Sequence, residues 1–257
     1  MDVASAAERS VPPYRQFAQF YDHVMGDAVA PVIGRCFERS CRRYDLRFAS
    51  AADIGSGTGT FLLHLAQLCD VLYGVDRSVE MLAQARRKLA GANVSFLQQD
   101  LRSLRLPQPV DLVTCMFDTL NYLTTTAGVQ AALQRARENL CDGRSLLFDV
   151  ITGAGEGGRA RRLLQRVSLP GTLAIWRLQT DGSQYRSCVE MLWRSPREPG
   201  SAQTWREVHQ QKWYPLPWLC TVLDRCGFQV CGIHDVLSYE PASPRTWWAH
   251  FVARRCC

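Results

Sequence analysis

A short glycine-rich stretch constrains the fold of this chain more than any other feature. Residues 51–60 read Ala-Ala-Asp-Ile-Gly-Ser-Gly-Thr-Gly-Thr, and a helical pattern of apolar residues follows. Glycine lets the backbone adopt positive φ and approach a ligand closely, and the start of a helix presents unpaired N–H groups at the same place. The stretch therefore predicts a strand, a tight turn and a helix that together form a ligand-binding edge.

The spacing of these glycines distinguishes two classes of ligand. A dinucleotide fingerprint, Gly-x-Gly-x-x-Gly, would place its third glycine at position 60, whereas the third glycine here is Gly59. Asp53 precedes the first glycine, and a carboxylate there would repel a pyrophosphate but suits a cationic or amino-bearing ligand. A second predicted strand ends on Asp76, where a carboxylate can accept hydrogen bonds from both hydroxyls of a ribose. The pattern disfavours a nicotinamide enzyme.

At this point the chain resembles the class I S-adenosylmethionine-dependent methyltransferases. Their first motif reads acidic-x-Gly-x-Gly-x-Gly, and their second strand ends in an acidic residue. The resemblance implies that S-adenosyl-L-methionine is the cofactor. It further implies that Asp53, Gly55, Gly57 and Gly59 form the site for the methionine part and that Asp76 holds the ribose.

Strand and helix patterns alternate regularly from residue 50 to residue 150. The expected strands are 51–54, 71–76, 94–98, 110–117 and 145–150, and the expected helices are 60–69, 78–90 and 128–140. Such units with short loops predict a parallel α/β sheet that binds ligands at the carboxyl ends of its strands. With two further strands at 228–236 and 247–254, the resemblance implies a seven-stranded Rossmann-like methyltransferase sheet, mostly parallel with the last strand antiparallel.

The N-terminal residues are expected to form a tail and a helical cap. Residues 1–13 are small and polar and predict a disordered or loosely attached tail. Apolar spacing predicts helices over 14–25 and 29–44. Tyr21-Asp22 resembles a segment with which small-molecule methyltransferases cover the cofactor mouth and contribute a tyrosine to the site. These aromatic residues could equally pack a capping helix onto the sheet, and both roles can hold.

The pattern changes after residue 150. A glycine-rich loop and a short arginine-bearing helix at 159–166 precede three alternating strands at 172–179, 184–194 and 204–213, which predict a small antiparallel sheet. A helix is expected at 216–226. The predicted organisation is a tail (1–13), an N-terminal helical cap (14–45), a Rossmann-like core that binds S-adenosylmethionine (46–150), an antiparallel lid (151–215) and the C-terminal part of the core sheet (216–257).

Three more positions for the cofactor follow from the resemblance. Asp100, after the third strand, corresponds to the acid that meets the adenine amino group, and Leu101 lies beside the ring. Phe117 ends the fourth strand, where the family places backbone contacts to the amino acid part. Asp76 and Asp100 could instead cap local turns. Three acids that end three successive strands favour the binding interpretation.

The acceptor site is expected beside the fourth strand. The segment Asp118-Thr119-Leu120-Asn121-Tyr122 is similar to one found in a bacterial subset of these enzymes. Asp118, Asn121 and Tyr122 could orient an amine or a hydroxyl, or Asp118 and Asn121 could cap the following helix.

Methyl transfer from a sulfonium is an in-line displacement, so the protein positions two reactants and removes a proton where needed. In an extended strand His209 and Trp213 share one face of the predicted lid. His209 is the leading candidate for the general base because histidine titrates near neutrality. Asp118 and Tyr21 are further catalytic candidates, and Trp213 and His23 are candidates for contacts with the acceptor.

Composition limits the alternatives. None of the 11 cysteines forms a Cys-x-x-Cys pair and most lie in apolar segments, which predicts free thiols, a cytoplasmic protein and no metal site. The net charge of +6 comes almost wholly from arginine that is not interleaved with aromatic residues, so a nucleic-acid partner is not expected. No stretch approaches the ~20 apolar residues of a membrane span.

The sequence therefore predicts a methyltransferase that acts on a small-molecule acceptor, with N- or O-methylation favoured. Aromatic residues in the lid favour an apolar or aromatic acceptor. Two alternatives stay open: an RNA or protein methyltransferase, and a protein of the same fold that binds S-adenosylmethionine without transferring methyl. The sequence does not predict an oligomeric state.

Overall fold

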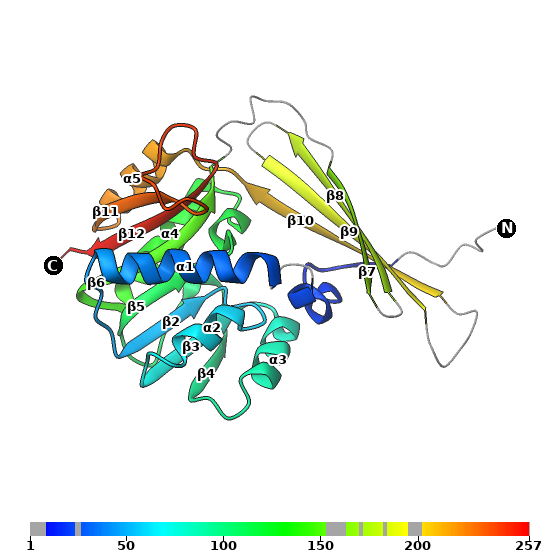
Figure 1. Cartoon of the computed structure of the whole chain (residues 1–257), viewed down its shortest axis with the longest axis horizontal. Helices are drawn as coiled ribbons and strands as arrows, with labels where there is room; N and C mark the ends of the chain where they lie inside the picture. The colour runs from blue at the N-terminus through cyan, green and yellow to red at the C-terminus, as the bar shows by residue number, and fades with distance from the viewer. Residues whose placement is uncertain are drawn as a thin grey trace.

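Two β-sheets organise the chain (Figure 1). A computed structural model describes residues 9–23, 27–152, 163–169, 172–181, 184–194 and 202–256. The larger sheet has seven strands and the smaller one has five. Figure 1 shows the smaller sheet extending away from the larger one, joined to it through the long strand β10 (Ala202–Lys212).

The seven-stranded sheet confirms the predicted fold class. Its order is β11-β12-β6-β5-β2-β3-β4. The strands are β2 (Ser50–Ile54), β3 (Val71–Asp76), β4 (Val94–Gln98), β5 (Val110–Cys115), β6 (Leu140–Ile151), β11 (Phe228–Asp235) and β12 (Trp248–Arg255). The first five strands pair in parallel, and the last strand, β12, is antiparallel to both of its neighbours. The carboxyl ends of the parallel strands therefore share one edge.

The helices cover both faces of this sheet. They are α1 (Asp27–Arg43), α2 (Thr60–Leu65), α3 (Val79–Lys88), α4 (Thr126–Glu138) and α5 (Leu216–Arg225). Ser78 starts α3 as predicted, because its hydroxyl accepts a hydrogen bond from the Met81 amide at 3.2 Å. Helix α2 is shorter than predicted and ends at Leu65.

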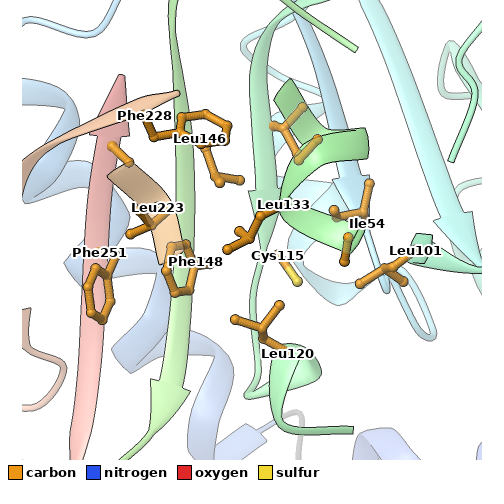
Figure 2. Close-up of a cluster of buried hydrophobic side chains, with 14 of the residues drawn as sticks. Ile54, Leu101, Cys115, Leu120, Leu133, Leu146, Phe148, Leu223, Phe228 and Phe251 are labelled. Carbon is orange, nitrogen blue, oxygen red and sulfur yellow. The ribbon is translucent and has the colours of Figure 1, made fainter. Parts of the chain in front are cut away.

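The core is a pair of apolar layers on either side of the sheet. Residues of α4 and α5 pack with β5, β6 and β12 in one layer, and α1 and α2 pack on the other face. Figure 2 shows the first layer, in which Phe148 and Phe251 point the same way from neighbouring strands. Their rings stack with centroids 4.6 Å apart. This burial holds rigid the strands whose ends form the site.

The smaller sheet has more strands than predicted. Its order is β1-β10-β9-β8-β7, with β1 (Arg9–Val11), β7 (Leu163–Leu169), β8 (Thr172–Asp181) and β9 (Gln184–Arg194). The three predicted strands are present as β8, β9 and β10. The predicted helix at 159–166 is wrong from residue 163 onward, where β7 pairs with β8, and residues 159–162 lie outside the described ranges. Within the expected tail, residues 9–11 instead pair in parallel with β10.

The N-terminal segment does not form the predicted helix over residues 14–25. Its described part consists of turns, a short 3-10 helix (Phe17–Gln19) and a further helical turn at residues 21–23. Residues 24–26 lie outside the described ranges. Tyr14 has φ of 65° and breaks the helical path. The carboxylate of Glu207 on β10 accepts hydrogen bonds from the backbone N–H groups of Tyr14, Gln16 and Phe17. The carboxylate of Glu207 thus takes the place of the backbone carbonyls that would accept these hydrogen bonds in a helix. The second predicted helix is present as α1.

Among the described residues, no helix has both the length and the apolar character needed to cross a membrane.

Candidate active site

A cavity opens at the carboxyl edge of the parallel strands, beneath the N-terminal segment. Eight predicted site residues line it: Tyr21, Gly55, Gly57, Asp76, Asp100, Leu101, Phe117 and Tyr122. Further lining residues are Tyr14, Ser56, Thr58, Thr60, Phe61, Arg77, Met81, Thr119 and Leu123. The fold therefore gathers into one place most of the residues that the sequence singled out for the cofactor.

The glycine loop has the backbone that its spacing predicts. Gly55, Gly57 and Gly59 all have positive φ, between 55° and 78°. A Cβ atom on Gly55 would collide with the side chain of Thr119, and one on Gly59 would lie 2.7 Å from Leu89. A Cβ on Gly57 would meet only Met81, at 3.6 Å. The positive φ favours glycine at all three positions, and packing also excludes a side chain at Gly55 and Gly59. Gly57 lines the cavity with no side chain between its backbone and a ligand.

Asp76 ties this loop to the next helix. Its Oδ2 accepts a hydrogen bond from the Gly57 amide at 2.9 Å, and its Oδ1 accepts one from the Ser78 amide at 2.8 Å. Burial raises the pKa of this carboxyl above its ordinary value, although the hydrogen bonds from Ser78 and Gly57 oppose that effect. Each oxygen keeps a second lone pair, so the carboxylate can accept further hydrogen bonds from a ligand in the cavity.

A second acid, Asp100, also lines the cavity. Asp100 accepts hydrogen bonds from the backbone and the guanidinium of Arg102, with its Oδ2 2.7 Å from Arg102 Nη2. These bonds hold the pKa of Asp100 below its ordinary value. Leu101 is buried beside it and offers an apolar surface for a flat ring. This arrangement suits the predicted adenine position.

A strained turn forms the wall at the end of β5. Phe117 and Asp118 both have positive φ, 60° and 47°. Asp149 on β6 holds this turn, because its two oxygens accept hydrogen bonds from the amides of Phe117 and Asp118 at 2.7 and 2.8 Å. Its Oδ2 also accepts one from Trp248 Nε1 at 2.6 Å. Burial and the nearby Asp118 raise the pKa of Asp149 to about 7, against these donors.

Sequence reasoning missed Asp149. The signal that could have found it is a single acid in the otherwise apolar run of residues 146–151. A buried carboxylate in such a strand needs several donors, and a turn at the end of the neighbouring parallel strand can supply them.

Asp53 lies beneath the glycine loop. It is 2 % exposed and accepts a hydrogen bond from the Thr114 hydroxyl at 2.7 Å. Burial raises the pKa of Asp53 to about 7. Asp53 and Gly59 are not among the residues that line the cavity, so they support the loop from behind.

Three tyrosines, Tyr14, Tyr21 and Tyr122, form a cluster in the lining of the cavity. The ring of Tyr14 packs edge-on against Tyr21, with centroids 5.9 Å apart, and lies 5.7 Å from Tyr122. The hydroxyls of Tyr14 and Tyr122 are hydrogen-bonded to each other. Burial raises the pKa of all three phenols, so they are neutral at physiological pH. Tyr14 had not been assigned to the site from the sequence.

His209 lies behind Tyr122 and does not line the cavity. Its side chain is 1 % exposed, and its Nδ1 is 3.1 Å from the Tyr122 hydroxyl oxygen. Its Nε2 is 3.4 Å from Oε2 of Glu207. The predicted base therefore reaches the cavity only through the hydroxyl of Tyr122.

Two other predicted residues, Asp118 and Asn121, are not among those that line the cavity and are held by contacts with β6 and β10. Gln211 donates a hydrogen bond of 2.5 Å from Nε2 to Asp118 Oδ2. The amide of Asn121 is used by backbone groups: it donates to the carbonyls of Ile151 and Lys212, and its oxygen accepts from the Ile151 amide. Asn121 is fully buried and does not line the cavity, so its contacts join β6 and β10 rather than reach an acceptor.

The remaining predicted residues do not line the cavity. His23 is exposed, and Trp213 is half-buried on β10's C-terminal side. Of the lid aromatics, Tyr214 is buried and stacks on Trp218 of α5. Within the described part of the chain, no group of three His, Cys, Asp or Glu side chains is placed to hold a metal ion.

The cavity fits the cofactor that the motif implies. The bare backbone at Gly57 and the carboxylate of Asp76 lie on one wall, and Asp100 with Leu101 lies further along. The Ser56 hydroxyl in the loop is buried, and no described group forms a hydrogen bond with it. Gly57 and Ser56 would hold the methionine part of S-adenosylmethionine, Asp76 the ribose, and Asp100 with Leu101 the adenine.

Comparisons with known proteins agree with this geometry. A family model described as a methyltransferase domain matches residues 51–143. The chain is 33 % identical over 245 residues to a protein of Geobacillus sp. (strain WCH70) named as a methyltransferase, covering 94 % of this chain and 99 % of that protein. It is 38 % identical over 94 residues, 37 % of this chain and 36 % of the other, to a dTDP-3-amino-3,6-dideoxy-alpha-D-glucopyranose N,N-dimethyltransferase of Streptomyces fradiae.

A solved structure extends the likeness to the whole fold. The crystal structure of an S-adenosylmethionine-dependent methyltransferase from Clostridium acetobutylicum ATCC 824 superimposes with a TM-score of 0.80 and 19 % identity, covering 95 % of this chain and 99 % of the other. The glycine loop, the acid that ends β3 and the full-length relative lead to the same result. The chain belongs to the class I S-adenosylmethionine-dependent methyltransferases and uses S-adenosylmethionine as its cofactor.

Proposed function

We propose that this enzyme methylates the amino group of a small-molecule acceptor. The observation that carries the proposal is the cluster of Tyr14, Tyr21 and Tyr122 in the lining of the cavity, with Asp118 near Tyr21 and Tyr122. Aromatic faces attract cationic groups, and a nearby carboxylate adds to that attraction. Asp118 is close enough to raise the pKa of Tyr21 and of Tyr122, after burial the largest effect on each.

The cofactor, when bound, would supply a methyl group attached to a sulfonium sulfur, and sulfur would keep the electron pair of that bond. The acceptor must therefore present a nitrogen lone pair and lose one N–H proton. Tyr122 lines the cavity, and its hydroxyl is hydrogen-bonded to Nδ1 of His209. The phenol can take the acceptor's proton while passing its own to the imidazole, so His209 serves as the base through Tyr122. In this proposal Tyr21 orients the amine, and the nearby carboxylate of Asp118 adds negative charge.

An amino sugar is the acceptor class to test first. The Streptomyces fradiae relative is named for an amino sugar linked to a nucleotide, and its match of 94 residues lies within a chain of the same family. The aromatic lining is consistent with such an acceptor, because tyrosine rings pack against apolar sugar faces and their hydroxyls bond to polar groups.

The test is methyl transfer from S-adenosylmethionine to a dTDP-3-amino sugar, followed by mass spectrometry. The matched control is the same sugar with a hydroxyl in place of the amine. We expect the amino sugar to gain one or two methyl groups and the hydroxy sugar none. Methylation of the hydroxy sugar, or of total RNA or protein under the same conditions without methylation of amines, would contradict the proposal.

A further inference from the structure

Glu207 is a fully buried acid on β10, two residues before His209 and on the same face of the strand. Its Oε1 accepts hydrogen bonds from the amides of Gln16 and Phe17 at 2.6 and 3.0 Å, and its Oε2 accepts one from the amide of Tyr14 at 2.7 Å. A buried carboxylate is costly unless donors surround it. Three backbone N–H groups from the N-terminal segment meet that need and show why the segment follows its irregular path.

The same carboxylate faces the histidine. Oε2 of Glu207 lies 3.4 Å from Nε2 of His209. An ionised carboxylate only accepts hydrogen bonds, so it favours the imidazole tautomer with its proton on Nε2. In that tautomer Nδ1 carries the lone pair, and Nδ1 is the atom 3.1 Å from the Tyr122 hydroxyl. The ring then accepts a proton at the position that faces the cavity.

We propose that Glu207 is a positioning residue for the reaction and acts through His209 on Tyr122. This inference rests on the proposed amine methylation. As the bond from nitrogen to the methyl carbon forms, the bond from sulfur to that carbon breaks and its electron pair stays on sulfur. The acceptor's N–H proton passes to the Tyr122 oxygen, and the Tyr122 proton passes to Nδ1 of His209. The imidazolium that results has its Nε2 3.4 Å from Oε2 of Glu207, and the negative charge of that carboxylate stabilises it. The proton leaves to solvent after the products have gone.

One oxygen thus joins the histidine to the N-terminal segment. Oε2 of Glu207 binds the Tyr14 amide and faces His209, and the Tyr14 hydroxyl is hydrogen-bonded to Tyr122. Tyr14 and His209 also contact edge-on, with ring centroids 4.8 Å apart. The Glu207 carboxylate therefore fixes the N-terminal segment and the His209 ring relative to each other.

Glu207→Gln tests this role while keeping the shape of the side chain. A glutamine has one NH₂ group, and every group around Glu207 named above is an N–H donor. The NH₂ must therefore face donors on one side. Placed toward His209, it favours the opposite tautomer, in which Nδ1 carries a proton and cannot accept another. The matched control is Glu138→Gln, which removes an exposed carboxylate at the end of α4.

The first measurement needs no acceptor. Nitrogen-15 NMR of the histidine rings distinguishes the two tautomers, and the His209→Gln variant identifies the signals of His209. We expect the wild-type protein and Glu138→Gln to show the tautomer with the proton on Nε2, and Glu207→Gln to lose it. A wild-type ring with its proton on Nδ1, or an unchanged tautomer in Glu207→Gln, would overturn the inference. Because the wild-type result stands alone, the test holds even if Glu207→Gln does not fold.

The second measurement is turnover with the dTDP-3-amino sugar. We expect Glu207→Gln to lower kcat by about 100-fold or more, the range that general base catalysis supplies, with the Kd for S-adenosylmethionine within about threefold of wild type. Equal kcat in the two proteins would overturn the inference. Failure of the wild-type enzyme to methylate any amine would instead count against the proposed function, and the tautomer result distinguishes the two failures.

Discussion

The Asp76 carboxylate accepts a 2.9 Å hydrogen bond from the Gly57 amide, and this bond connects the end of β3 to the middle of the glycine loop. The acid therefore has two tasks, because it shapes the loop and also presents lone pairs to the cavity. A loss at this position should affect the cofactor before it affects the acceptor.

Asp76→Ala should weaken S-adenosylmethionine binding by about 2–3 kcal/mol, since charge-assisted hydrogen bonds to the ribose and to the loop amides are lost together. Isothermal titration calorimetry measures the change. Asp70→Ala, an exposed acid just before β3 at the opposite end of the strand, is the control and should bind as wild type. Undiminished affinity in Asp76→Ala would rule out the ribose contact.

Asp22 links the N-terminal segment to the glycine loop and to α3. Asp22 accepts a hydrogen bond from the Thr58 hydroxyl at 2.5 Å, and its other oxygen is 2.8 Å from Lys88 Nζ. Burial alone would raise the pKa of Asp22, but the hydrogen bonds from Lys88 and Thr58 outweigh it and lower the pKa. Asp22→Asn should speed amide hydrogen exchange in residues 14–23 by up to about tenfold.

The control for that variant is Asp45→Asn, which removes an exposed acid paired with Arg47. Exchange measured by mass spectrometry should not change in the control. Identical protection of residues 14–23 in both variants would show that Asp22 does not fasten the segment.

The turn at Phe117 depends on Asp149. Asp149→Asn places an NH₂ group against N–H donors and should lower the free energy of unfolding by about 1–3 kcal/mol. Trp248→Phe removes one of the three donors and leaves both backbone bonds in place, so its hydrogen-bond loss should be smaller, about 1 kcal/mol. Urea denaturation of both variants measures the difference. An Asp149→Asn variant as stable as wild type would contradict the role in the turn.

Asp53 should make stability depend on pH. Burial raises its pKa from 3.8 to about 7 in the folded protein. Between those values the folded state holds a proton that the unfolded state has lost, so the contribution of Asp53 to stability falls as pH rises from about 4 to 7. The decrease is roughly 1 kcal/mol per pH unit. Asp53→Asn has no proton to lose, and its stability should fall less steeply.

Urea unfolding at pH 5, 6, 7 and 8 gives the slope of the free energy of unfolding against pH for wild type and for Asp53→Asn. Equal slopes in wild type and Asp53→Asn would show that Asp53 is ionised throughout the range. Asp149 acts in the same direction, so wild type and Asp53→Asn should both retain some decrease.

The cofactor half of the site was predictable because its signals are local. Gly55, Gly57 and Asp76 lie within 22 consecutive residues, and glycine spacing and strand ends are read from short stretches. The sheet followed from the same alternation of strands and helices. Individual roles at the cofactor end stay predictions, although the cavity contains most of the residues concerned.

The part of the site around Tyr14 and Tyr122 was harder to predict because its contacts join distant parts of the chain. Tyr14 meets Glu207 across 193 positions and Tyr122 across 108. Apolar periodicity predicted a helix at residues 14–25. Periodicity carries no information about the three backbone amides that donate hydrogen bonds to Glu207 on β10. Asn121 was assigned to the acceptor from its place after a strand, but backbone groups of Ile151 and Lys212 occupy its amide.

The 193 positions between Tyr14 and Glu207 also order events on the ribosome. At about 5–20 residues per second, roughly 10–40 seconds pass between the synthesis of these two residues. Gly57 and Asp76 are only 19 positions apart and emerge almost together. In a nascent chain Tyr14 is therefore made long before its partner on β10, and their hydrogen bond forms only when the last fifth of the polypeptide is being made.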